Sequence, residues 1–211
     1  MESNYKPEED LIAIRNMMER SSKFLSLSGL SGIFAGLCAI IGVTIASFTM
    51  SDSGSISLED IILNFGNIST LTGKASIITS AVVILILAFG GAVFFSVRNA
   101  KRKNLRLWNK TTKQLLNHLF IPLVAGGLFS LILFFHNNIQ LVAANTLIFY
   151  GLALVNAGKF TFGEIHYLGL CEIVLGLFAA VFVNLGILFW TLGFGVLHIV
   201  YGLVMYRKYE K

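Results

Sequence analysis

Charged side chains are scarce in this 211-residue sequence: they make up 13% of it, while 55% of the residues are hydrophobic. A soluble domain usually carries about a quarter charged residues, because its surface must be wetted by water. No Asp, Glu, Lys or Arg occurs between Leu25 and Phe48, or between Ala75 and Val97. Apolar runs longer than about 18 residues can cross a bilayer as helices. The shortage of charge therefore excludes a soluble domain and predicts a membrane protein.

Other residue types and motifs that would direct function are also rare or missing. The two cysteines, Cys38 and Cys171, both fall inside predicted spans, so a disulfide framework is not implied. The three aspartates, Asp10, Asp52 and Asp60, all lie outside the spans, which excludes intramembrane aspartyl chemistry. No HExxH motif, nucleotide-binding glycine loop or Cys/His cluster occurs. We expect no metal ion and no cofactor.

The apolar segments are predicted to be helices. In hydrocarbon each spanning segment must satisfy its own backbone hydrogen bonds, which leaves helices or a closed barrel. Barrel strands would alternate apolar and polar residues, whereas Ile77–Phe89 is apolar at nearly every position. The fold class is therefore an all-α membrane protein, a bundle of six transmembrane helices. The predicted spans are residues 24–48, 75–97, 115–135, 139–155, 167–185 and 187–206, which together form one transmembrane domain, 24–206.

The distribution of basic residues predicts the orientation of these spans. Of the 16 Lys and Arg residues, all but Lys74 flank the spans on one side of the predicted membrane. The positive-inside rule places this side in the cytoplasm, which puts both chain ends there. The formal charge of +5 is thus interpreted as a topology signal, and we expect no nucleic-acid partner.

Two segments outside the spans are expected to contact the membrane surface. Residues 1–23 are predicted to form an amphipathic juxtamembrane helix, with Leu11, Ile14 and Met18 on one stripe. This helix either lies on the bilayer or docks a cytoplasmic protein partner at residues 7–23. Residues 207–211 form a basic cytoplasmic tail. Basic residues after the second span are expected to bind anionic lipid head groups; they are Arg98, Lys101, Arg102, Lys103 and Arg106.

Two ionisable residues lie well inside predicted spans, Glu172 in the fifth and His198 in the sixth. An acid or base at a helix centre costs about 2.5–3.5 kcal/mol on insertion scales, so each requires a reason. The tight hairpin at Asn184 and Gly186 places the two at similar depth. We leave three interpretations open: a structural pair, a proton or ligand site, or two residues that do not touch.

Small residues recur at helical spacing in three of the predicted spans. Such faces allow helices to approach closely, within the bundle or in a homo-oligomer. In spans five and six they accompany Glu172 and His198, so we expect these two faces to meet. The residues are Ser28, Gly32 and Gly36 in span one, Gly176 and Ala180 in span five, and Gly195 and Gly202 in span six. Residues 29–39 and 169–179 also share a glycine spacing, which indicates either a duplication or chance.

A resemblance to known proteins is carried by residues 18–24 leading to 28–32, by residues 192–195 with 197–202, and by Glu172 between them. With these features the chain resembles, over most of its length, a group of uncharacterised bacterial inner-membrane proteins. This resemblance implies a bacterial cytoplasmic membrane and carries over no activity. The leading functional hypothesis is a non-enzymatic, partner-binding or regulatory membrane protein. The alternative is a small-solute or ion/proton-coupled transporter that uses Glu172 and His198.

A more remote alternative is an intramembrane hydrolase, because Gly29-Leu30-Ser31-Gly32 is similar to the serine motif of rhomboid proteases and His198 could be its base. In that family the serine precedes the fourth core span and works near the external face. Here Ser31 lies in span one, near the predicted cytoplasmic side, so the motif departs from the family pattern.

Overall fold

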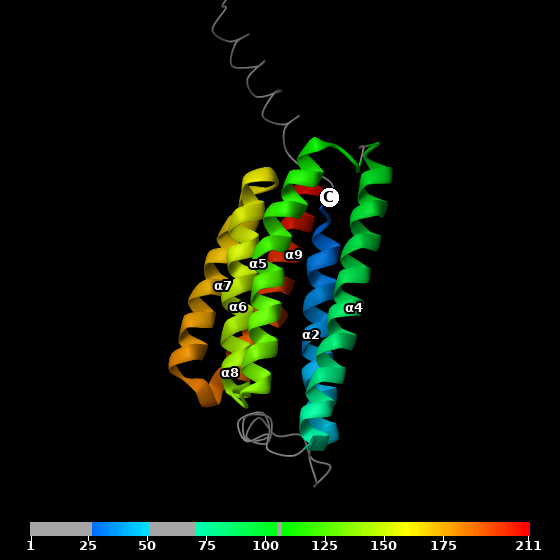
Figure 1. Cartoon of the computed structure of the whole chain (residues 1–211). Helices are drawn as coiled ribbons and strands as arrows, with labels where there is room; N and C mark the ends of the chain where they lie inside the picture. Colours follow the sequence, from blue (N-terminus) through cyan, green and yellow to red (C-terminus); the bar gives the residue numbers. More distant parts are fainter. Residues whose placement is uncertain (1–26, 51–70, 105–106) are drawn as a thin grey trace, which may run out of the picture.

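The computed structural model describes residues 27–50, 71–104 and 107–211, and every regular element within them is a helix (Figure 1). Six helices are long and apolar enough to cross a membrane, which indicates a multi-pass membrane protein. Many large apolar side chains on their outer faces are exposed, as expected where lipid replaces water. The predicted juxtamembrane helix 1–23, the docking segment 7–23 and Arg106 lie outside the described residues.

The six spans follow one another as an antiparallel bundle. The first three are α2 (Gly29–Met50), α4 (Leu71–Arg102) and α5 (Lys110–Phe135). The fourth is α6 (Val142–Ala157), preceded by a 3-10 turn at Ile139–Leu141 and followed by one at Gly158–Phe160. The fifth is α7 (Gly163–Val181), followed by a 3-10 turn at Val183–Leu185. The sixth is composite: α8 (Gly186–Trp190), a π-helical segment η4 (Thr191–Leu197) and α9 (His198–Tyr209).

Several helices extend beyond the predicted spans at the end that carries the basic residues. α4 continues through Arg98 to Arg102, and α9 continues to Tyr209, so most of the predicted tail 207–211 is the last turn of a helix. Cations in the last turn are favourable because the helix C-terminus carries partial negative charge. α2 begins at Gly29, five residues after the predicted start of the first span. Apolar run length identified the spans, but it could not locate their polar ends.

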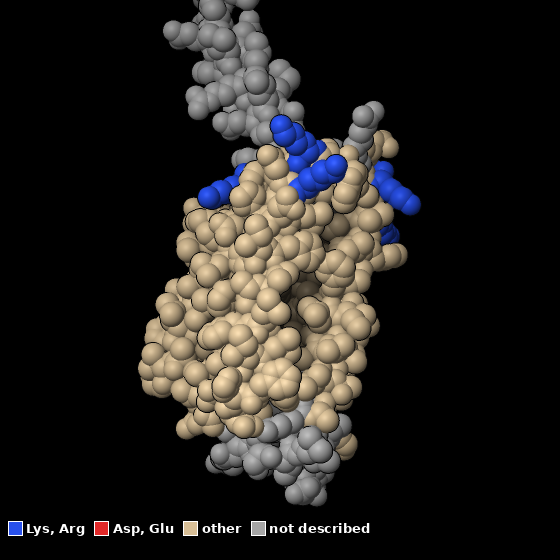
Figure 2. Space-filling view, viewed as in Figure 1, with Lys and Arg blue, Asp and Glu red and all other residues tan. Residues whose placement is uncertain are grey.

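The helices form two groups, which we name by their members (Figure 1). The first group is α2, α4 and the η4–α9 segment, because α2 packs against both α4 and α9. The second group is α5, α6 and α7, with α6 packed between the other two. The two groups meet along α7 and α9, and we call this boundary the seam. At the seam α7 contacts η4 and α9 through few residues. Figure 2 shows a hollow in the surface at the boundary between α5 and the first group.

Lys and Arg side chains gather at one end of the bundle, which we call the basic end (Figure 2). The chain segments there are the last turns of α4 and α9 and the first turn of α5. Arg98, Lys101, Arg102 and Lys103 are all exposed. Their clustering agrees with the charge asymmetry of the sequence, and the cytoplasmic placement of this end remains a prediction.

Two helix pairs, α2 with α9 and α6 with α7, pack through glycine in the same way. A Cβ on Gly29 or Gly202 would overlap the backbone of the other helix, and the same holds for Gly151 and Gly169. α9, from the first pair, and α6, from the second pair, also share a short sequence. It is Ile-Val-Tyr-Gly-Leu at 199–203 and Ile-Phe-Tyr-Gly-Leu at 148–152. The repeat at 29–39 and 169–179 thus lies in the two helices, α2 and α7, that pack on these two related sequences.

The small residues of spans five and six pack differently from our expectation. Gly176 packs on Ile148 of α6, whereas Gly195 and Gly202 pack on α2. The two faces therefore do not meet each other, and Ala180 is exposed while its neighbour Ala179 is fully buried. Residues at four-residue spacing do not lie in a straight row, because an α-helix has 3.6 residues per turn. The row drifts around the helix axis, and position 180 therefore leaves the contact face.

The small face of span one is used inside the bundle. Gly32 lies against the backbone of Gly202, and Gly36 lies against Gly195 and Ile199. Ser28 is buried and hydrogen-bonded through its hydroxyl. This face is thus covered by α9 of the same chain and is closed to a second copy.

Candidate functional site

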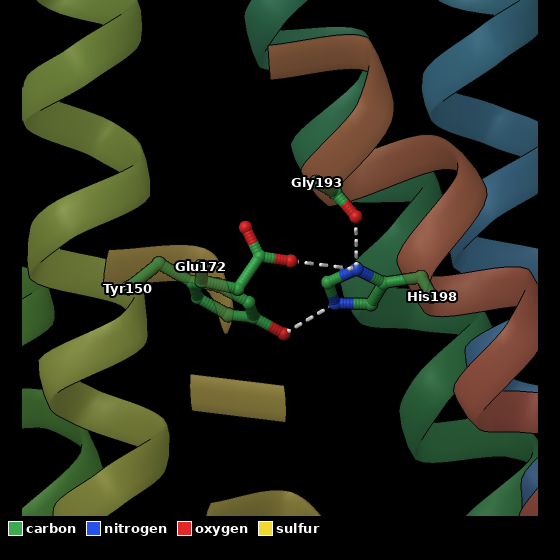
Figure 3. Close-up of polar contacts among 4 residues, drawn as sticks. All are labelled: Tyr150, Glu172, Gly193 and His198. Atoms are coloured by element: carbon green, nitrogen blue, oxygen red, sulfur yellow. Dashed lines mark hydrogen bonds and ion pairs between the residues drawn. The ribbon is translucent and has the colours of Figure 1, made fainter. Parts of the chain in front are cut away.

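The structure brings Glu172 and His198 together at the seam (Figure 3). Glu172 lies on α7 and His198 is the first residue of α9. The Nδ1 atom of His198 is 3.3 Å from the Oε1 atom of Glu172. Glu172 is completely buried and His198 is 5% exposed. The pair therefore joins the two helix groups through a dry acid–base contact.

Both ring nitrogens of His198 have further partners. Nδ1 lies 3.0 Å from the carbonyl oxygen of Gly193, and Nε2 lies 2.8 Å from the hydroxyl oxygen of Tyr150 (Figure 3). A carbonyl oxygen only accepts, so Nδ1 carries a proton and donates it. Nε2 accepts from the Tyr150 hydroxyl when the ring is neutral and donates to it when the ring is charged. Tyr150, on α6, is not among the residues expected from the sequence, because a tyrosine within a predicted span is ordinary.

The π-helical segment η4 shapes this contact. π-helical turns are rare and often occur at functional sites. The backbone N–H of His198 bonds to the carbonyl of Gly195, while the imidazole side chain reaches the carbonyl of Gly193. A Cβ at Gly193 would overlap the Oε2 atom of Glu172 and the side chain of Leu147. A side chain at 193 would therefore displace the carboxylate of Glu172 or the end of Leu147 from its position.

The carboxylate of Glu172 is the least satisfied group in this site. Among the described residues, neither of its oxygens has a hydrogen-bond donor, and both are fully buried. Burying a charge is costly unless the charge is paired. Glu172 and His198 together have no net charge either as a carboxylate with an imidazolium or as a carboxylic acid with a neutral imidazole. The loss or the gain of a proton from either arrangement leaves a net charge in the buried site.

Aromatic side chains surround the imidazole. The ring of Phe194 is stacked with that of His198 at 5.8 Å and an interplanar angle of 18°. Phe194 also contacts Tyr150, at 4.9 Å, and Trp190, at 4.8 Å between ring centroids. Leu147, completely buried, packs with this cluster. Because Glu172 has no exposed surface, water does not reach the carboxylate in this conformation.

Two other polar residues of the spans have structural roles. Asn145 donates to the carbonyl of Gly126 and to the hydroxyl of Ser130, and so ties α6 to α5. The hydroxyl of Ser31 donates to the carbonyl of Ser28 within α2. His198, whose nitrogens face Tyr150 and Gly193, is not paired with Ser31. The structure thus does not bring Ser31 and His198 together.

The described residues also contain no cluster of three or more His, Cys, Asp or Glu side chains that could hold a metal ion. The buried constellation is thus an acid, an imidazole, a phenol and a backbone carbonyl. This set can store and move a proton, and its position links the two helix groups. No known protein family, curated protein or solved structure matched this chain, so its function has to be argued from this geometry.

Proposed function

We propose that this chain is a non-enzymatic regulatory membrane protein whose two helix groups change their contact when the Glu172–His198 pair gains or loses a proton. The observation that carries the proposal is the carboxylate of Glu172, fully buried at the seam and facing His198 at 3.3 Å. A small protein that required only a stable core would be better served by apolar residues here, because replacing a buried ion pair with them is often neutral or stabilising.

The physical mechanism follows from the charge of the pair. With one proton the site is neutral, and the seam is at its most stable. A second proton, or none, leaves a net charge among apolar rings, and the two groups then gain by separating so that water can reach the charge. The titratable group that faces the pair is Tyr150 on α6, and Tyr150 in turn interacts with Tyr201 on α9. Seam opening is therefore coupled to proton number.

Proton-coupled transport is the second candidate. In many transporters the substrate site lies between structural repeats near the middle of the membrane. Here the acid–base pair lies between two helix pairs of the same glycine packing, α2 with α9 and α6 with α7. The dry surroundings of Glu172 favour the regulatory proposal, since a transporter must open this site to each side in turn.

Tryptophan fluorescence tests the proposed function directly. The chain has two tryptophans, and Trp108→Phe leaves Trp190, which contacts Phe194, as the single reporter near His198. In lipid nanodiscs we expect the emission of Trp190 to change in a step as pH is varied. Glu172→Gln and His198→Gln should remove the step, whereas His136→Gln, at an exposed position, should retain it. A Trp190 signal that is flat with pH in the parent protein would refute the proposal.

A liposome experiment separates regulation from transport. Protein reconstituted with an internal pH-sensitive dye should pass no protons beyond the level of empty liposomes under an imposed pH gradient. A proton flux that disappears in Glu172→Gln would instead establish the transporter. Because both measurements use the same variants, loss of the fluorescence step with no flux identifies a sensor.

The proposal includes a location and partners. We propose a bacterial inner-membrane protein with both ends in the cytoplasm, which the gathering of basic residues at one end supports. Anionic lipid head groups would bind the exposed residues Arg98, Lys101 and Arg102, and a protein partner would bind residues 7–23. Reporter fusions at residues 62 and 105 should lie on opposite sides of the membrane. Blue-native electrophoresis would show whether the chain forms a homo-oligomer through its remaining exposed faces.

A further inference from the structure

The last residues of the chain form a cluster of contacts at the basic end. The Nζ atom of Lys208 and the hydroxyl of Tyr209 both donate to one oxygen of Glu164, near the start of α7; the second of these hydrogen bonds is 2.9 Å long. The ring of Tyr209 packs on Phe162 at 4.3 Å. The end of α9 is thus tied across the seam to the beginning of α7.

The same residues also bind α2 and the end of α4. Glu210 accepts hydrogen bonds from the backbone N–H of Gly29 and the hydroxyl of Ser28. Its carboxylate therefore caps the N-terminus of α2, where negative charge is favourable. Lys103 donates to the backbone carbonyl of Tyr209 at 3.1 Å. We call residues 208–210 the clasp, because they join the first helix group to the second at the basic end.

The clasp and the buried pair lie on the same seam. Glu164 and Glu172 are two turns apart on α7, about 12 Å along the helix axis. Between them the seam is closed by apolar contacts of Leu197 and Tyr201 with Leu154, Ile165 and Leu168. At the opposite end, α7 continues into the sixth span through the short turn Val183–Leu185. Because this short turn connects α7 covalently to the sixth span, the two helices are held together there. The basic end is the end at which they can separate.

The two polar contacts of the seam differ in exposure. Lys208 is 57% and Glu164 22% exposed, whereas Glu172 and His198 are almost fully buried. Exposed ion pairs contribute little and are screened by salt. The clasp is therefore the weaker of the two polar contacts and the one that solvent and salt already reach.

We infer that residues 208–210 are a releasable clasp that holds the basic end of the seam closed and thereby controls water and proton access to Glu172. This inference rests on the proposed function for its consequence, but the clasp itself can be tested separately. A cationic surface or a partner that competes for Glu164, or one that binds Glu210, would release it.

Distances between spin labels provide the test. The full chain with Cys38→Ala and Cys171→Ala would carry nitroxides at Tyr167→Cys on α7 and Val204→Cys on α9, both at exposed positions. In lipid nanodiscs the parent should show one short distance. Glu164→Gln and a chain that ends at Arg207 should each add a longer distance, with the ratio of open to closed protein raised about tenfold in the truncated chain. A chain lacking only Lys211, which is exposed, is the matched control.

The outcomes separate the clasp from the proton site. An unchanged distance distribution in both Glu164→Gln and the truncated chain overturns the clasp, whatever the fluorescence of Trp190 does. A longer distance in both variants, with the Lys211 control unchanged, supports it. If the distances lengthen while Trp190 does not respond to pH even in the parent, the clasp stands and the proposed function fails. A truncated chain that does not fold leaves Glu164→Gln, a conservative change at a partly exposed residue, to decide.

Discussion

The helix pairs α2–α9 and α6–α7 pack their backbones through glycine in the same way, but they carry different ionisable residues at matching positions. In the pair α2 and α9, Gly32 lies three residues after the matched glycine Gly29; in the pair α6 and α7, Glu172 lies three residues after Gly169. Likewise α9 carries His198 where α6 carries Leu147. Each pair thus contributes one of the two ionisable residues, and they meet at the seam between the pairs. The comparison shows that two helix pairs with the same glycine packing can meet through a polar contact at the positions where their sequences differ.

The largest expected effect comes from removing one partner of the buried pair. His198→Leu leaves the carboxylate of Glu172 buried without a partner, which should lower the free energy of unfolding by about 3–5 kcal/mol. The double variant Glu172→Leu with His198→Leu replaces the acid–base contact at the seam by an apolar contact and should recover most of that loss. Chemical unfolding in detergent micelles measures both. Losses that simply add in the double variant would show that the two residues are not coupled.

Glycine substitutions test whether the two pairs are equivalent. Gly151→Ala in the second pair and Gly202→Ala in the first should each cost about 1–3 kcal/mol, because a Cβ would overlap the backbone of the facing helix. Gly127→Ala is the control, since no atom of the described residues lies within 4 Å of the position that its Cβ would take. A large loss at one site and none at the other would separate the pairs.

The cap on α2 distinguishes the first pair, because Glu210 binds the start of α2. Glu210→Ala should reduce the free energy of unfolding by about 1 kcal/mol, the usual effect of losing a helix cap. Thermal unfolding followed by circular dichroism measures the change. Lys211→Ala, at the exposed last residue, should behave as the parent protein, and equal behaviour of both variants would argue against the cap.

The smallest effect compares the two matched tyrosines. Tyr150→Phe removes the hydroxyl that bonds Nε2 of His198 and should cost about 0.5–1.5 kcal/mol. Tyr201 occupies the corresponding position in the first pair, and Tyr201→Phe should cost less because its hydroxyl does not bond His198. Urea unfolding of the two variants side by side gives the difference. A greater loss for Tyr201→Phe would contradict the assignment of Tyr150 to the site.

Much of the fold could be predicted from apolar run length alone. Apolar run length predicts six spans, and six helices that are long and apolar enough to span a membrane are present. The helix ends were less predictable: α9 continues to Tyr209 because its last residues find partners on other helices. Such partners come from distant parts of the chain, and hydropathy has no information about them.

The candidate site was predictable only in part. Glu172 and His198 were identifiable because an ionisable residue in a span is costly, and a tight hairpin puts the two at similar depth. Tyr150 and Gly193 were not identifiable, since a tyrosine in a span and a glycine in a helix are ordinary. Their roles depend on the π-helical segment and on the position of α6, which bring a hydroxyl and a carbonyl to the same imidazole.

The amino-acid sequence by itself determined that the chain crosses a membrane and that its buried ionisable residues are few, because both follow from the cost of placing charge in hydrocarbon. It also carried the glycine spacing of both helix pairs. Only the tertiary structure decided which faces meet: α7 turns its glycines to α6, and α9 turns its glycines to α2, so that Glu172 and His198 face each other at the seam. The physical reason is that glycine allows close approach without choosing a partner, whereas the choice depends on the complementary surfaces of all six helices.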